Sequence, residues 1–222
     1  GLADNADWRA TNLRAGPRSM AATLSFRGIP QGELELAVPG LTNLLDAMAA
    51  VAAGVEQGIA FPVVAAALRS FRAVRRRFDV VAQGRGITVI SDYAHHPTEI
   101  AAFMQQVRGL APARVRAVFQ AHRYTRTAVL GPAFPPSFAG VDELILVPVY
   151  AASEDPVPGG TLSDLHGHFQ RWGKIPVITA QSLLEAWDVI RKKWRAGDVV
   201  LVIGAGDVEQ IAFHAAAELN GE

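Results

Sequence analysis

From Phe78 onward the sequence alternates between short apolar runs and longer stretches in which apolar residues recur at helical spacing. The apolar runs, which we interpret as strands, are Ile87–Ile90, Val115–Phe119, Leu144–Val147, Val177–Ile178 and Val199–Ile203. The helical stretches lie near Pro97–Arg108, Ser163–Trp172, Ser182–Trp194 and Val208–Leu219. Strands that are apolar along nearly their whole length and alternate with helices are typical of a parallel sheet covered on both faces. We therefore predict an α/β fold with a doubly wound, mostly parallel, Rossmann-like sheet over about residues 78–222.

Residues 1–77 follow a different pattern. It predicts two short strands, Met20–Phe26 and Glu33–Val38, joined by a Gly/Pro turn, and then two helices, Asn43–Gln57 and Phe61–Phe71. Two strands and two helices make a poor independent core, so we interpret residues 1–77 as part of a larger domain.

The composition excludes several classes of function. There is no cysteine, so disulfides, thiolate catalysis and cysteine metal sites are excluded, and we expect a cytoplasmic protein. The 21 basic and 21 acidic residues balance, so no net charge attracts nucleic acid or an anionic membrane surface. No window approaches the roughly 18 consecutive apolar residues of a transmembrane helix. We expect neither nucleic acid nor membrane as a partner.

Polar side chains follow the strand predicted at Ile87–Ile90. Asp92, Tyr93, His95 and His96 lie between this strand and the next helix. Ligands of doubly wound sheets bind beyond the carboxyl ends of the strands, so these side chains are candidates for a site. The alternative is a loop that only caps the helix. We predict no metal site, because no third ligand accompanies the two histidines.

Two arginines follow the next strand. Arg123 and Arg126 lie in a loop after Val115–Phe119, and their guanidinium groups suit a carboxylate or a phosphate. The alternative is a solvated basic loop. Two further segments, Tyr150–Glu154 and Gly204–Asp207, also follow strands, although the second could be only a tight turn.

Together these segments resemble the Mur ligase family, and within it the branch that adds alanine. Ser91–Glu99 resembles the family's DDYGHHPTE, and Phe119–Thr127 its FQPHRYTRT. Further similar segments are Tyr150–Glu154 (YAAGE), Gly204–Asp207 (GAGD), residues 76–79 (RRFD) and Gly40–Ala50 (a degraded GxHNxxNxxAA). They occur in order across nearly the whole chain.

The resemblance implies an ATP-dependent ligase of bacterial peptidoglycan synthesis that joins L-alanine to UDP-N-acetylmuramate through an acyl phosphate, with Mg²⁺ shielding the phosphates. It implies that residues 1–77 are part of the central ATPase domain and residues 78–222 the C-terminal amino-acid-binding domain. It also implies that the N-terminal part of the same protein is a partner of this chain.

The resemblance also implies roles for single residues. Catalytic roles fall on Asp92, His95 and Arg77. The residues that surround the amino acid would be Tyr93, His95, Arg123 and Arg126. The nucleotide-binding residues would be Asn43, Asp46, Arg77 and Asp92.

Several departures from the family pattern lead to alternatives. Thr42 replaces a family His, Asp46 replaces an Asn, which puts adenine recognition in doubt, and Ser91 replaces an Asp. No GxxxxGK[ST] phosphate-binding loop occurs in the sequence, so we expect that this chain alone is an inactive fragment. The alternatives are the murein-tripeptide recycling ligase of the same family and a non-catalytic α/β ligand-binding module.

Overall fold

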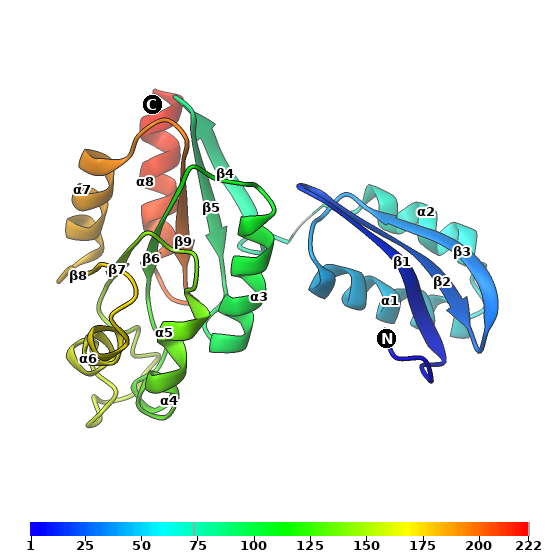
Figure 1. The fold of residues 1–222 in the computed structure, drawn as a ribbon, viewed down its shortest axis with the longest axis horizontal. Helices are drawn as coiled ribbons and strands as arrows, with labels where there is room; N and C mark the ends of the chain where they lie inside the picture. The colour runs from blue at the N-terminus through cyan, green and yellow to red at the C-terminus, as the bar shows by residue number, and fades with distance from the viewer. Residues whose placement is uncertain (73, 222) are drawn as a thin grey trace. The chain divides into compact units, whose positions relative to one another are not determined.

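The computed structural model describes residues 1–72 and 74–221. The chain divides into two compact units, Gly1–Ala73 and Val74–Glu222 (Figure 1). Our assignment of residues 1–77 and 78–222 to two ligase domains stays a prediction.

The first unit is a three-stranded antiparallel sheet covered on one face by two helices. Its elements are β1 (Trp8–Gly16), β2 (Ser19–Phe26), β3 (Ile29–Leu36), α1 (Leu41–Glu56) and α2 (Phe61–Ser70), with strand order β1-β2-β3. Leu24 and Leu34 of the sheet and Leu44 and Val51 of α1 are fully buried in its core. The prediction of two strands was wrong because β1 was missed. Only Ala10 of this edge strand is buried, so the strand lacks an apolar run.

The second unit confirms the predicted α/β fold. Its six-stranded sheet has the order β4 (Asp79–Gly84), β5 (Ile87–Asp92), β9 (Asp198–Ile203), β6 (Arg114–Phe119), β7 (Glu143–Leu146) and β8 (Val177–Thr179). All neighbours pair in parallel except β4, which pairs antiparallel with β5. We did not predict β4. Arg85 and Gly86 join it to β5 with φ angles of 53° and 76°, the positive values of a tight hairpin turn.

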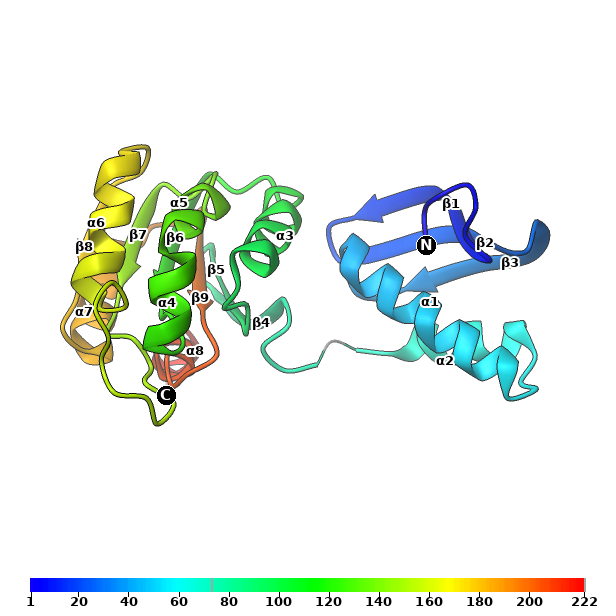
Figure 2. The same ribbon diagram turned by 90° about the horizontal axis from the view of Figure 1, so that it is seen from below.

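Helices cover both faces of this sheet (Figures 1 and 2). The helices are α3 (Pro97–Arg108), α4 (Tyr124–Leu130), the 3₁₀ helix η1 (Gly131–Ala133), α5 (Phe134–Ser137), α6 (Leu162–Trp172), α7 (Leu183–Lys193) and α8 (Glu209–Asn220). α3, α5 and α6 pack on one face, while α7 and α8 pack on the other. Both faces of the central strands are therefore buried, which explains why their sequences are apolar at nearly every position.

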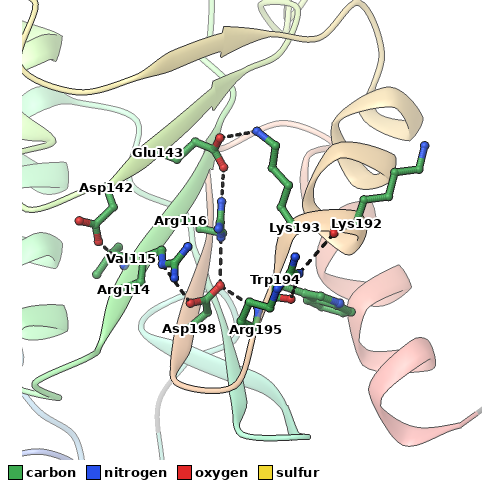
Figure 3. A network of polar contacts seen from close by, with 10 residues as sticks. All are labelled: Arg114, Val115, Arg116, Asp142, Glu143, Lys192, Lys193, Trp194, Arg195 and Asp198. Carbon is green, nitrogen blue, oxygen red and sulfur yellow. Dashed lines mark hydrogen bonds and ion pairs between the residues drawn. The ribbon is translucent and has the colours of Figure 1, made fainter.

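A charged network ties the amino ends of the central strands together (Figure 3). Arg116 of β6 is 6% exposed, and its Nε donates to Oδ2 of Asp198 in β9 at 3.0 Å. Its Nη1 donates to Glu143 of β7, which also accepts from Lys193. Arg116 thus joins β6 to both of its neighbours. The carboxyl ends of the strands lie at the opposite end of the sheet, where Asp92 ends β5 and the loops after β6, β7 and β9 begin.

Candidate functional site

Asp92 ends β5 and is 6% exposed. Its Oδ2 accepts the backbone N–H of Phe78, and its Oδ1 accepts that of Ala94, both at 2.8 Å. Burial raises the pKa of the Asp92 carboxyl, against the opposing effects of these two hydrogen bonds and of Arg77. The Asp92 carboxylate therefore holds the backbone at Phe78, just before β4, against the end of β5. Ser91 and Asp92 lie within the strand, not after it as we predicted.

His96 and Glu99 cap the N-terminus of α3. The Oε2 of Glu99 accepts the N–H groups of His95 and His96 at 3.0 and 3.1 Å, and the Nδ1 of His96 accepts the N–H of Thr98 at 3.3 Å. This is a capping box with histidine at the N-cap. The capping alternative thus accounts for His96 and Glu99. Nδ1 of His95 lies 3.1 Å from the Tyr93 carbonyl and 3.5 Å from Oε2 of Glu99, which leaves Nε2 of His95 and the Tyr93 ring to the site.

Tyr93 is held by the arginine run that precedes β4. Its N–H donates to the carbonyl of Arg76 at 2.7 Å, and the guanidinium groups of Arg76 and Arg77 lie 4.8 and 5.7 Å from its ring centroid. The Nη2 of Arg76 also donates to the carbonyls of Gly204 and Gly206 after β9. We had singled out Arg77, which is exposed. Arg76 was missed, since a run of three arginines does not reveal which one points inward.

The segment after β6 is a loop up to Arg123, as predicted, but from Tyr124 it is the helix α4, so the prediction was wrong for Arg126. Arg123 is the N-cap of α4. Its backbone has φ 73° and ψ 133°, a conformation that residues other than glycine rarely adopt. Arg126 lies in the first turn, and its Nη1 is 3.4 Å from Nδ1 of His122. The Nη1 of Arg123 is 3.5 Å from Oε1 of Glu154, in the segment after β7.

Four rings connect the strand ends in a row. The centroids of Tyr93 and His95 are 5.6 Å apart, those of His95 and His122 5.7 Å, and those of His122 and Tyr150 5.5 Å. These residues follow β5, β6 and β7, so three loops meet at one edge of the sheet. We call Tyr93, His95, His122 and Tyr150, with Arg126 beside His122, the strand-end cluster.

Gln120, the residue that follows β6, connects the loop after β9 to this cluster. The Nε2 of Gln120 donates to Asp207 at 2.8 Å, and its Oε1 accepts the N–H of Val208 at 3.1 Å. A Cβ atom on Gly206 would lie 2.4 Å from Oε1 of Gln120 and 2.6 Å from Cγ of Tyr150. Gly206 is therefore required by close packing. The segment Gly204–Asp207 therefore allows the end of β9 to pack closely against the segments that follow β6 and β7.

His122 is the titrating group at the centre of the cluster. Its pKa is lowered by partial burial and by the positive charge of Arg126, with smaller effects of His95 and Arg123 and an opposing effect of Glu154. The neutral ring can accept a hydrogen bond from Arg126 at Nδ1. The arginines therefore stay the positive groups of the cluster, which favours an anionic group of a ligand.

Asn43 and Asp46 lie on α1 in the first unit. The Nδ2 of Asn43 donates to the carbonyl of Pro39 at 2.6 Å, and Asp46 is exposed. Their predicted role in nucleotide binding stays a prediction. Across residues 1–72 and 74–221, no three or more His, Cys, Asp or Glu side chains are grouped to hold a metal ion. None of the helices in these residues combines the length and hydrophobicity of a membrane span.

The chain is similar to known proteins. A family model described as "Mur ligase, glutamate ligase domain" matches residues 76–206. The UDP-N-acetylmuramate–L-alanine ligase of Pelotomaculum thermopropionicum is 40% identical over 203 residues, which cover 91% of this chain and 44% of that protein. The corresponding ligase of Anaeromyxobacter dehalogenans is 40% identical over 208 residues, covering 94% and 45%.

A solved structure is also similar. The crystal structure of UDP-N-acetylmuramate–alanine ligase MurC from Thermotoga maritima superposes with a TM-score of 0.83 at 25% identity. The match covers 99% of this chain and 47% of that one. The chain thus spans about half the length of the relatives that it matches.

Proposed function

Because the chain belongs to the Mur ligase family, we propose that it supplies the amino-acid-binding part of an ATP-dependent ligase that joins L-alanine to UDP-N-acetylmuramate in peptidoglycan synthesis. The proposal concerns a protein of the length of its relatives, in which the N-terminal part would be the partner of this chain. The relatives named above carry the name of this activity.

One observation carries the proposal. The strand-end cluster brings Tyr93 and His95, from the loop after β5, together with Arg126, from the first turn of α4, and Arg123 follows His122 directly in the chain. A guanidinium group binds a carboxylate through paired hydrogen bonds. We propose that Arg123 and Arg126 bind the carboxylate of alanine, while Tyr93 and His95 lie beside its amine and methyl group.

The proposed contribution of these residues is positioning. Holding the amine next to an activated carbonyl group lowers the entropic part of the barrier, and fixed charges stabilise the tetrahedral intermediate. We propose His95 as the group nearest to the reacting amine. Arg77, which is exposed, would be free to contact a nucleotide. Asp92 would act through the backbone that it holds, because both of its oxygens already accept backbone hydrogen bonds.

ATP and Mg²⁺ would be bound mainly outside this chain. ATP would activate the carboxylate of UDP-N-acetylmuramate as an acyl phosphate, which the amine of alanine then attacks. The sequence has no GxxxxGK[ST] loop, and residues 1–72 and 74–221 contain no cluster of metal-ligating side chains. Our proposal therefore places no magnesium ligand among these residues and assigns no step of this chain to the metal.

The test is ADP release by the full-length protein. With ATP, Mg²⁺ and UDP-N-acetylmuramate present, we expect ADP release that depends on L-alanine. ADP release that depends on the tripeptide L-Ala-γ-D-Glu-meso-diaminopimelate and not on alanine would favour the recycling ligase. No ADP release with either amino substrate would favour a non-catalytic module. Either of these two results would overturn the proposed substrate.

A further inference from the structure

Glu154 is a carboxylate next to the strand-end cluster that the proposed function does not use. It lies in the segment after β7, and it reaches across to the start of α4 after β6. Its Oε2 accepts the N–H of Thr125 at 3.0 Å, and its Oε1 accepts the Thr125 hydroxyl at 2.8 Å. The same Oε1 is 3.5 Å from Nη1 of Arg123.

The start of α4 has no cap of its own. Its N-cap residue is Arg123, which provides no side-chain hydrogen bond and has a positive φ. The first N–H groups of a helix need acceptors, and a carboxylate there also interacts favourably with the helix dipole. Glu154 supplies this acceptor from another loop. Its pKa is lowered, first by the hydrogen bond from the Thr125 backbone, so it is ionised at neutral pH.

The chain adopts an uncommon backbone to place Glu154. Ala152 and Ser153 have φ angles of 48° and 69°, in the left-handed region that residues other than glycine seldom occupy. The N–H of Arg123 donates to the carbonyl of Tyr150 at 2.8 Å, which ties the same two loops together. Strained residues that converge on one contact persist where the surrounding structure holds them, and they cluster at functional sites.

We infer that Glu154 is a positioning residue that holds the Arg123 side chain and the first turn of α4 in the arrangement that binds the carboxylate of the amino acid. This inference rests on the proposed function. Two of the three contacts of Glu154 go to Thr125. Glu154 therefore mainly fixes the backbone at the start of α4, and it competes little with a substrate carboxylate for Arg123. The alternative, in which Glu154 only blocks Arg123 until substrate displaces it, predicts the opposite change in affinity.

The experiment uses the full-length protein and the dependence of ADP release on L-alanine, with ATP and UDP-N-acetylmuramate saturating. Glu154→Ala should raise the KM for alanine roughly tenfold with kcat within about twofold. Glu154→Gln should raise it only about threefold, since the amide oxygen can still accept from Thr125 but carries no charge. Glu185→Ala is the control, because Glu185 also accepts a backbone N–H at the start of a helix, from Gln181 before α7, and should leave the KM unchanged.

A double-mutant cycle tests the route through Arg123. Because Glu154 contacts both Arg123 and Thr125, the variant that combines Arg123→Ala with Glu154→Ala should have a KM for alanine below the product of the two single effects. An unchanged or lowered KM in both Glu154 variants, or effects that multiply in the double variant, would overturn the inference. A wild-type protein without alanine-dependent ADP release would overturn the proposed function, and the inference with it.

Discussion

The Nη1 atom of Arg126, in the first turn of α4, lies 3.4 Å from the Nδ1 atom of His122, four residues earlier in the chain. An arginine only donates hydrogen bonds, so this contact is a hydrogen bond only when Nδ1 of His122 is unprotonated and the ring proton is on Nε2. The imidazole is therefore neutral where it orients Arg126. This relationship makes the charge of the strand-end cluster depend on pH.

Acidification should weaken alanine binding. The pKa of His122 lies below its ordinary value of 6.5 because burial and then Arg126 disfavour the charged ring. For a depressed pKa, the favourable interaction is complete above the ordinary value and is lost as the pH falls through the lowered one. In the full-length protein, the KM for alanine should rise as the pH falls below 6.5. His122→Gln keeps an acceptor that does not titrate, so its KM should change less, and equal pH profiles would contradict the role of His122.

Removing Arg126 should weaken alanine binding directly. Loss of a charge-assisted contact to the carboxylate costs about 2 kcal/mol, which corresponds to a roughly thirtyfold rise in the KM for alanine. The measurement is Arg126→Ala in the full-length protein by ADP release. Arg191→Ala is the control, because Arg191 pairs with Asp188 on α7. If the KM stayed at the wild-type value, Arg126 would have no part in binding the carboxylate.

A methyl group at Gly206 should disturb the site. The Cβ of Gly206→Ala would overlap Gln120 and Tyr150, and overpacking of this kind costs about 1–3 kcal/mol of unfolding free energy. We expect a lower unfolding free energy and a raised KM for alanine, since Tyr150 stacks on His122. Gly167→Ala in α6 is the control, because its Cβ would meet only Arg171 Nη1 at 3.7 Å. Equal stability of the two variants would contradict this account.

The buried network at the other edge of the sheet should matter for stability. Arg116→Ala would leave the buried Asp198 with Arg114, 3.5 Å away, as its only charged partner in β6, at a cost of about 3 kcal/mol. Lys193 is 42% exposed at its side chain, so Lys193→Ala should cost at most about 1 kcal/mol. Urea unfolding, followed by the fluorescence of Trp187 and Trp194 in the neighbouring core, measures both. A small loss for Arg116→Ala would show that the network contributes little.

Much of the sheet unit could be predicted from the sequence. The five parallel strands and the helices between them were predicted because both faces of these strands are buried, and their sequences are apolar for that reason. β1 and β4 were missed because each lies at a sheet edge and buries little. α4 was missed because its own first residues provide no capping side chain. The acceptor at its start comes from Glu154, which lies 30 residues after Tyr124, the first residue of the helix.

What the sequence by itself determined is therefore local: the alternation of elements, the polar segments at strand ends, and the family motifs that they carry. The tertiary structure decided which side chains face the site and which serve the backbone. Arg76, and not Arg77, donates a hydrogen bond to the loop after β9, at the carbonyl of Gly206, 130 positions later in the sequence. Both carboxylate oxygens of Asp92 accept hydrogen bonds from backbone N–H groups. The physical reason is that a side chain's partner depends on which strands become neighbours, and β9 enters the sheet between β5 and β6 only when the whole unit has folded.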